Sequence, residues 1–363
     1  MDIPRWKQWP HVLETQQFYP DVLEPMMAHM QAVCDALVEG RRVPRLSEKR
    51  PRILKIYRDE PSTRTEDTFY TAGMYLEYHV RLILGDFSSE MKGETVEDLV
   101  MAITQVGGMG FLRSADFFVI RNKKDGAAHK AVEVIEDANA DGCRRIPLPV
   151  INAGDGAGQH PTQALVDLAT IYRERRRINH HPLENLTIIM AGDTRYSRTI
   201  NSLCHLLGRF GTKHRIRIIF CSHPELTPKE GILGYLKENG IAYEIEEDFQ
   251  RAIREADVIY MTRLQKERFA SPELYEAVKG AYVFYEKYLS LLKPGAFITH
   301  PLPINAMTLG TPPEIDQALA PLARRNDPRC AWGRESIGSI AYRYGLLDIM
   351  DAGLQEEENK RRH

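Results

Sequence analysis

The stretch that decides the fold is residues 52–65, RILKIYRDEPSTRT, with the segment that follows it. The short apolar run RILKIY ends at a Pro-Ser-Thr turn, and residues 66–78 have the composition of a helix. This order predicts a strand, a loop and a helix. Further elements alternate along the first half, with strands at 80–84, 116–120 and 148–152 and helices at 94–106 and 126–139. Such alternation predicts a parallel sheet that helices cover on both faces.

The second half of the chain repeats the alternation. Strands are predicted at 186–191, 215–221, 241–245, 257–261 and 296–299, and helices at 197–209, 228–239 and 248–255. A helix that begins at Pro161 and runs to about Arg177 is long enough to cross between domains. We therefore predict two doubly wound parallel-sheet α/β domains joined by interdomain helices, the first over 1–165 and the second over 166–330.

The ends of the chain carry weaker patterns. Residues before 52 are interpreted as a polar entry segment. Residues 335–352 predict an amphipathic helix, which we expect to pack back on the first domain. The charged tail EEENKRRH, residues 356–363, is predicted to be solvated and frayed.

Composition narrows the class of partner. The 363 residues include 48 basic and 50 acidic side chains, for a net charge of −2, so no basic field attracts nucleic acid. No apolar run is long enough for a membrane span and the N-terminus lacks signal-peptide order, so we expect a cytoplasmic protein that acts on small molecules. The five cysteines are scattered and never spaced CxxC, which fits neither a disulfide framework nor a zinc site. We expect them to be reduced and mostly buried.

The loop at 61–65 is a candidate phosphate site. It lies between a predicted strand and a predicted helix, where backbone N–H groups and the positive end of the helix dipole face the loop. Three hydroxyls and the guanidinium of Arg64 would add side-chain donors. The simpler interpretation is that Ser62 or Thr63 caps the helix, and capping does not exclude phosphate binding. No GxxxxGK[ST] or GxGxxG motif is present, so the two common nucleotide-binding loops are not expected.

Single basic residues mark further candidate positions. The glycine-rich loop at 154–163 delivers His160 to the start of a helix, where a neutral imidazole suits polarising a carbonyl. Arg121 and Arg198 each follow a predicted strand, at the edge where open α/β sheets bind ligands. Taken alone, each of the three also fits a structural or solvated residue.

Two segments late in the chain could bind a carboxylate and an amine. Arg263 and Gln265 follow the strand VIY and fall on one side if the chain stays extended, which would pair a guanidinium with an amide as a carboxylate clamp. The segment HPLP, residues 300–303, follows the strand AFIT. Its two prolines remove backbone donors and leave carbonyl acceptors suited to an amine.

The segments PSTRT, GQHPTQ, GDTRYSRT, YMTRLQKER and HPLP occur in this order over residues 52–303. Together they resemble the catalytic chains of the aspartate/ornithine carbamoyltransferase family, on its aspartate side. The resemblance implies a first domain that binds carbamoyl phosphate, a second that binds L-aspartate, and a homotrimer with active sites shared between subunits. It implies carbamoyl transfer to the α-amino group of aspartate, giving N-carbamoyl-L-aspartate and phosphate in pyrimidine biosynthesis, without a cofactor or a metal.

The resemblance also assigns roles position by position. Carbamoyl phosphate would be bound by Ser62, Thr63, Arg64, Thr65, Arg121, His160 and Gln163. Aspartate would be bound by Lys92, Arg198, Arg263, Gln265 and the carbonyl of Leu302. Ser88 and Lys92 would come from the neighbouring subunit, with Ser89 as an alternative to Ser88. The implied catalytic residues are Arg64, Thr65, Lys92, Arg121 and His160, and the departing phosphate would take the second proton of the amine.

The identity of the acceptor depends on two motifs and one departure. Thr162 and Pro301 resemble aspartate members of the family, whereas ornithine members have cysteine at both places. Aspartate members continue after HPLP with an arginine and an acidic segment, but this chain has residues 304–313 before Glu314. A carbamoyltransferase with another acceptor is therefore the alternative, and a non-catalytic ligand-binding homologue is a remote one. Regulatory or pathway partner chains, feedback and assembly beyond a trimer are left open.

Overall fold

A computed structural model describes residues 11–60, 62–85, 95–104, 114–140, 148–178, 181–265, 269, 271–304 and 312–360. The chain divides into two compact units, which we call unit 1 (Met1–Leu165 with Ser339–His363) and unit 2 (Val166–Gly338). Two helices contain the points of division, α5 (Pro161–Arg176) and α11 (Trp332–Lys360). Within the described ranges, no helix is long and apolar enough to cross a bilayer.

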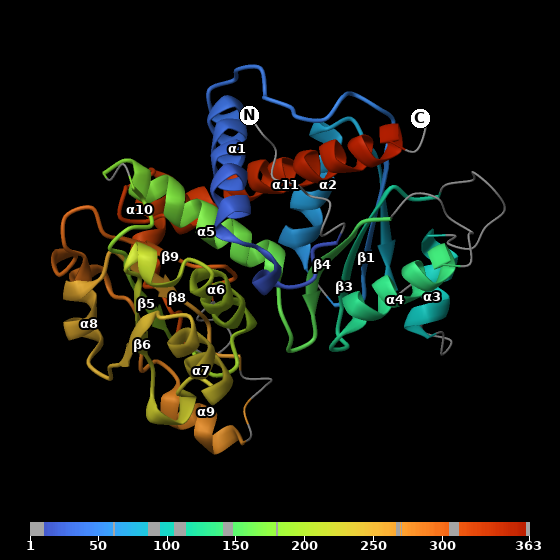
Figure 1. Ribbon diagram of the computed structural model, residues 1–363. Helices are drawn as coiled ribbons and strands as arrows, with labels where there is room; N and C mark the ends of the chain where they lie inside the picture. Colours follow the sequence, from blue (N-terminus) through green and yellow to red (C-terminus); the bar gives the residue numbers. More distant parts are fainter. Residues whose placement is uncertain are drawn as a thin grey trace. The chain divides into compact units, whose positions relative to one another are not determined.

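Unit 1 contains a parallel sheet of four strands in the order β2-β1-β3-β4 (Figure 1). The strands are β1 (Ile53–Arg58), β2 (His79–Leu84), β3 (Phe117–Asn122) and β4 (Val150–Asp155), and the helices between them are α2 (Thr63–Tyr75), α3 (Val96–Thr104) and α4 (Ala127–Ala140). Apolar residues of the central strands, such as Tyr57 and Phe118, are buried against α3 and α4. This burial on both faces explains why the strands read as short apolar runs.

Unit 2 contains a parallel sheet of five strands in the order β7-β6-β5-β8-β9 (Figure 1). The strands are β5 (Thr187–Ala191), β6 (Arg217–Cys221), β7 (Ala242–Ile245), β8 (Val258–Met261) and β9 (Phe297–Thr299). The further helices are α6 (Arg198–Gly208), α7 (Glu230–Glu238), α8 (Phe249–Glu255), α9 (Pro272–Val278) and α10 (Ala320–Arg324). Ile189, Ile259 and Phe284 belong to its buried core. The predicted fold class, two parallel-sheet α/β domains, is confirmed.

Strand order places one ligand-binding edge in each unit. In unit 1 the chain moves from β1 to β2 on one side and then returns to β3 on the other, so the order reverses between β1 and β3. In unit 2 the same reversal lies between β5 and β8. Open parallel sheets bind ligands at the carboxyl ends of the strands that flank such a reversal. The segments that follow these four strands are therefore the places to look for a site.

Two predictions about the ends of the chain are wrong. The segment interpreted as polar entry contains a 19-residue helix, α1 (Pro20–Val38), with apolar residues such as Leu23 and Met26 buried. The tail is not frayed within the described residues, because α11 continues to Lys360 and buries Glu358 against Arg52 at 2.8 Å. A charged residue near a chain end is buried when another part of the fold supplies its counter-ion.

The predicted amphipathic character of α11 is also wrong over part of its length. All residues from 341 to 350 are buried, so this part of the helix has no solvent-facing side. Polar residues within it are satisfied by unit 1: Asp348 lies 2.9 Å from His29, and Asp351 accepts a hydrogen bond of 2.7 Å from Tyr78. These polar side chains of α11 are therefore buried and hydrogen-bonded, and they do not form a solvent-exposed face.

Candidate active site

The loop after β1 leads directly into α2. Ser62 precedes the helix, but its side chain makes no capping hydrogen bond, so the capping interpretation of this residue does not hold. Thr63 and Arg64 are exposed in the first turn and Thr65 is buried. First-turn N–H groups have no acceptor inside their own helix and favour an anion. Backbone donors, hydroxyls and a guanidinium therefore meet at the carboxyl end of β1.

Thr65 contacts His160, the residue before α5. The Thr65 hydroxyl lies 3.5 Å from Nε2 of His160, and the Thr162 hydroxyl lies 3.3 Å from Nδ1. The histidine is 4% exposed. A hydroxyl can donate or accept, so both ring nitrogens have a polar neighbour whichever of them carries the proton. The imidazole is thus buried and oriented at the same edge of the sheet as the loop after β1.

Arg121 completes this edge in unit 1. It is paired in register with Arg58, the last residue of β1. Its Nη1 donates to the carbonyl of Ala153 at 3.0 Å, and its Nη2 lies 2.8 Å from a carboxylate oxygen of Glu60. The guanidinium is therefore held between the end of β4 and the loop after β1. Glu60 was not predicted as part of the site, although its position directly before the PSTRT segment could have indicated it.

The turn that carries His160 is tied to the N-terminal segment. The Gln159 side-chain oxygen accepts from the backbone N–H of Thr15 at 2.9 Å and from its hydroxyl at 2.8 Å. Gln163, one turn into α5, is half-buried and its N–H donates to the carbonyl of His160 at 3.0 Å. Thr15 was not predicted, because its segment was interpreted as polar entry.

In unit 2, the segments that follow β5 and β8 are bound to each other. Asp193 accepts from the N–H of Tyr196 at 2.8 Å and from the N–H of Gln265 at 3.3 Å. The Gln265 amide donates in turn to the carbonyl of Tyr196 at 3.1 Å. Arg198 is the first residue of α6, whose cap is the Ser197 side chain. These contacts gather Arg198 and Gln265 at the reversal between β5 and β8.

Burial alternates along the segment after β8. Thr262 and Leu264 are buried, whereas Arg263 and Gln265 are half-buried. Side chains of an extended segment alternate between two sides, so Arg263 and Gln265 share one side. The carboxylate clamp remains a prediction, since the role of each side chain needs a bound acceptor to test it.

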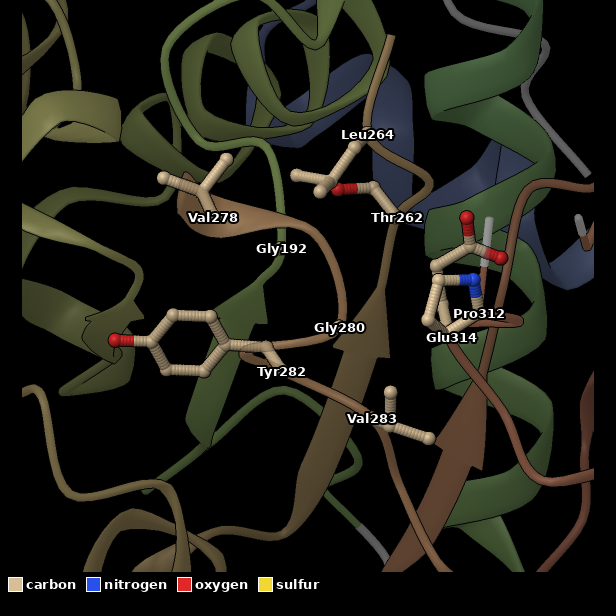
Figure 2. Close-up of a pocket in the computed structure, with 9 residues that line it drawn as sticks. All are labelled: Gly192, Thr262, Leu264, Val278, Gly280, Tyr282, Val283, Pro312 and Glu314. Carbon is tan, nitrogen blue, oxygen red and sulfur yellow. The ribbon is translucent and has the colours of Figure 1, made fainter. Parts of the chain in front are cut away.

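A small pocket lies on the other side of this segment (Figure 2). Its lining includes Thr262, Leu264, Tyr282 and Glu314. Gly192, which follows β5, also lines it with a φ of +99°, and a Cβ there would lie 2.3 Å from the carbonyl oxygen of Thr262. Glycine is thus required for the two strand ends to approach each other. Thr262 and Leu264, which alternate with Arg263 and Gln265, line this pocket.

The HPLP segment forms a tight turn after β9. Leu302 has a φ of +56°, and a cis peptide bond joins it to Pro303. The Leu302 N–H donates to Nδ1 of His300 at 2.8 Å, and Nε2 of that ring lies 3.8 Å from a carboxylate oxygen of Glu314. A backbone N–H can bond only to a deprotonated ring nitrogen, so any proton on this imidazole is on Nε2, facing Glu314. His300 was seen in the sequence only as part of a motif.

The predicted site residues thus fall into two groups, one in each unit. The group in unit 1 follows β1 and β4 and includes Arg121 at the end of β3, and the group in unit 2 follows β5, β8 and β9. Ser88, Ser89 and Lys92 lie outside the described residues, as does 305–311 of the segment after HPLP. Their predicted roles stay predictions.

Metal-ligating and thiol side chains are scattered through the part of the chain that the structure describes. It contains no group of three or more histidine, cysteine or acidic side chains placed to hold a metal ion. Cys34, Cys204, Cys221 and Cys330 are buried and form no disulfide, and Cys143 lies outside the described residues. Burial raises the pKa of the Cys221 thiol to about 12, which suits a core residue rather than a nucleophile.

Two family models match the chain. The carbamoyl-P binding domain of aspartate/ornithine carbamoyltransferase matches residues 10–173, and the Asp/Orn binding domain of the same family matches residues 184–318. An aspartate carbamoyltransferase catalytic subunit of Methanothrix thermoacetophila is 35% identical over 342 residues, 94% of this chain and 97% of that protein. A chloroplastic aspartate carbamoyltransferase of Oryza sativa is 34% identical over 94% of this chain and 85% of its own length.

Solved structures give the same likeness. The catalytic subunit of M. jannaschii aspartate transcarbamoylase superposes with a TM-score of 0.74 at 30% identity, over 93% of this chain and 97% of that one. Aspartate transcarbamoylase from Trypanosoma cruzi, in complex with N-(phosphonacetyl)-L-aspartic acid, has a TM-score of 0.76 at 26% identity, over 93% of this chain and 94% of that one.

Proposed function

Since the chain belongs to the aspartate/ornithine carbamoyltransferase family, we propose that it transfers the carbamoyl group of carbamoyl phosphate to the α-amino group of L-aspartate. The observation that carries the proposal is the placement of the two residue groups. Each lies at the carboxyl edge of the sheet of its own unit, at the strand-order reversal and the strand next to it, within the ranges matched by the carbamoyl-P and Asp/Orn binding models. The products are N-carbamoyl-L-aspartate and phosphate, and the reaction belongs to pyrimidine biosynthesis.

The residues of unit 1 bind and polarise carbamoyl phosphate. Arg64 and the first turn of α2 neutralise the phosphate, which is a good leaving group. Thr65, His160 and Arg121 donate to the carbamoyl oxygen as negative charge develops on it. Ser62, Thr63 and Gln163 complete the pocket. Prepositioned donors of this kind lower the barrier without any covalent intermediate.

The residues of unit 2 hold the acceptor. Arg198, Arg263 and Gln265 bind the two carboxylates of aspartate, and the carbonyl of Leu302 accepts a hydrogen bond from the amine. The deprotonated amine attacks the carbonyl carbon, phosphate leaves, and the phosphate takes the second amine proton. Orientation of the two substrates supplies most of the rate.

Assembly as a homotrimer with shared sites is part of the proposal. Unit 1 carries exposed large apolar residues on α2, namely Tyr70, Met74 and Tyr75, which suit a subunit interface. The shared site predicts complementation between an R64A chain and a K92A chain, each nearly inactive alone. About three quarters of random trimers are mixed and each regains one site of three, so roughly a quarter of wild-type activity should return. A mixture as inactive as its parts, with mixed trimers confirmed by native mass spectrometry, would exclude sharing.

A cytoplasmic location stays a prediction, and two plant relatives are named as chloroplastic. Cell fractionation tests it.

The acceptor is tested by a carbamoylation assay with purified chain, carbamoyl phosphate and a panel of amino acids and amines. We expect aspartate to give the highest kcat/KM. The segment after HPLP, which departs from the aspartate members, is the reason to include other acceptors. A higher kcat/KM for another amine would move the chain to the alternative function, and no turnover with any amine would favour the non-catalytic one.

A further inference from the structure

Two carboxyl groups are buried together in unit 2, outside the residue groups assigned above. Asp167 lies on α5 and Glu335 on α11, and they are 0% and 3% exposed. Their side chains hydrogen-bond to each other. Two ionised carboxylates are acceptors only, so such a bond requires a proton on one of them. The site assignment uses neither residue.

Hydrogen-bond donors surround both carboxyl groups. Asp167 accepts a hydrogen bond of 2.7 Å from the Tyr260 hydroxyl on β8. Glu335 accepts from the Thr299 hydroxyl at the end of β9 and from the backbone N–H of His300. Burial and the charge of Asp167 raise the pKa of Glu335 well above its usual value. Burial and the adjacent Asp167 outweigh the two donors to Glu335, which favour its ionised form, so we assign the shared proton to Glu335.

This pair lies between the two elements that hold the acceptor. On one side Tyr260 also hydrogen-bonds Thr199, which neighbours Arg198 at the start of α6. On the other side Glu335 holds the N–H of His300, whose ring accepts from Leu302. A buried chain of hydrogen bonds thus runs from α6 to the turn that presents the Leu302 carbonyl.

The turn needs such an anchor. Leu302 has a left-handed φ of +56°, which is unfavourable for a non-glycine residue and persists only where neighbouring contacts fix it. The contact that fixes it locally is the bond to His300, and the contact that fixes the start of the turn is the bond from His300 to Glu335. The direction of the Leu302 carbonyl therefore depends on Glu335.

We propose that protonated Glu335, bound to ionised Asp167, is a positioning residue that aims the Leu302 carbonyl at the acceptor amine. The proposal rests on the proposed function for the identity of that amine. Ionisation of Glu335 would place two carboxylates together without a counter-ion and release the turn. The titratable groups facing the pair are Tyr260 from β8 and His300 from the end of β9, with Glu314 facing the far side of the His300 ring.

The proton itself is tested by infrared difference spectroscopy at neutral pH, without substrate. Wild type minus E335Q should contain the carbonyl stretch of a protonated carboxyl group. Its absence would mean that Glu335 is ionised and would overturn the proposal. This arm is independent of activity, so it still decides the state of the pair if the chain does not carbamoylate aspartate.

Positioning is tested by steady-state kinetics on matched variants. E335Q keeps a donor toward Asp167 and should stay within about threefold of wild type, whereas E335A should lose on the order of 10- to 100-fold in kcat/KM for aspartate and much less for carbamoyl phosphate. The control is E174Q, which changes a buried carboxylate on α5, the helix of Asp167, that pairs with Arg334 at 2.9 Å and Arg177 at 2.8 Å. We expect its kinetics to be unchanged.

Two outcomes contradict the positioning role. One is an E335A chain with wild-type kcat/KM for aspartate, and the other is an equal loss for both substrates. If E335A does not fold, T299V replaces it, because this nearly isosteric change removes only the hydroxyl that donates to Glu335. The pH profile adds a readout that a purely structural role would not move: the fall in kcat/KM at alkaline pH should lie at higher pH in E335Q. Identical profiles would count against the proposal.

Discussion

Unit 1 and unit 2 have the same kind of sheet but treat buried charge differently. In unit 1, Arg52 is 3% exposed and lies 2.8 Å from both Asp351 and Glu358. In unit 2, Asp167 and Glu335 are buried next to each other, and burial with the neighbouring carboxylate raises the pKa of Glu335 well above its usual value. Both clusters use α11. The difference teaches that a buried carboxyl group on one helix can be a fixed charge or a neutral acid, depending on what the neighbouring strand supplies.

The largest expected effect comes from breaking the ion cluster of unit 1. R52L removes the buried guanidinium from Asp351 and Glu358 and leaves them with the half-buried Arg45 at 3.9 Å and Arg50 at 3.1 Å, respectively. We expect it to lower the free energy of unfolding by about 3–5 kcal/mol in urea denaturation. The matched control is R217A, which removes an arginine that pairs with Glu244 and Glu255 at the surface of unit 2. Surface pairs contribute about 0–1 kcal/mol. Equal losses in the two variants would refute the contrast.

The substrate half of unit 1 is tested by R64A. We expect turnover to fall by two to three orders of magnitude, roughly 3–4 kcal/mol of transition-state stabilisation, with little change in unfolding. Arg64 is exposed, so its removal opens no cavity. R41A, another exposed arginine of unit 1, serves as the control in the same assay. Near-normal turnover of R64A would remove this residue from the site.

The third prediction concerns how His11 makes the stability of unit 1 depend on pH. Burial lowers the pKa of His11 in unit 1 from 6.5 to about 4, and its Nδ1 accepts from the N–H of Val150. The unfolded chain binds the proton more readily, so the free energy of unfolding should fall by about 3 kcal/mol as pH drops from about 6.5 to below 4. H11Q should lack this fall relative to wild type. Parallel curves for the two proteins would contradict the burial of a neutral ring.

The acceptor half of unit 2 is tested by R263A. We expect KM for aspartate to rise at least tenfold, about 1.4 kcal/mol, while KM for carbamoyl phosphate changes little. R254A, an exposed arginine on α8, is the control. An equal rise for both substrates would contradict the division of labour between the two units.

The smallest expected effect is the contribution of Glu335 to the free energy of unfolding, which changes with pH in the opposite direction to that of His11. The folded pKa of Glu335 is raised, so its proton stabilises the fold at low pH and stability is lost as pH rises above the usual glutamate pKa toward the folded one. E335Q should show less loss of unfolding free energy across this window than wild type. If the free energy of unfolding changed equally with pH in wild type and E335Q, Glu335 would not be the group that holds the proton.

The sequence by itself determined the fold class and the candidate site. Buried parallel strands such as β1 and β8 read as short apolar runs, and five motifs kept their order along the chain. Positions after strand ends were predictable, because the carboxyl edge of a parallel sheet is set by connectivity alone. The family followed from the same residues.

Only the tertiary structure decided which charged residues have a partner in a distant part of the fold. Glu60, Asp167, Glu335 and Glu358 look like solvated side chains in the sequence, since acidic residues on helices and loops usually face water. Each is instead in contact with a partner distant in the fold: Arg121, Tyr260, Thr299 and Arg52, respectively. The periodicity of a sequence predicts which segments are helices and strands, but not which elements pack against them. The partners of these polar side chains are therefore known only from the folded structure.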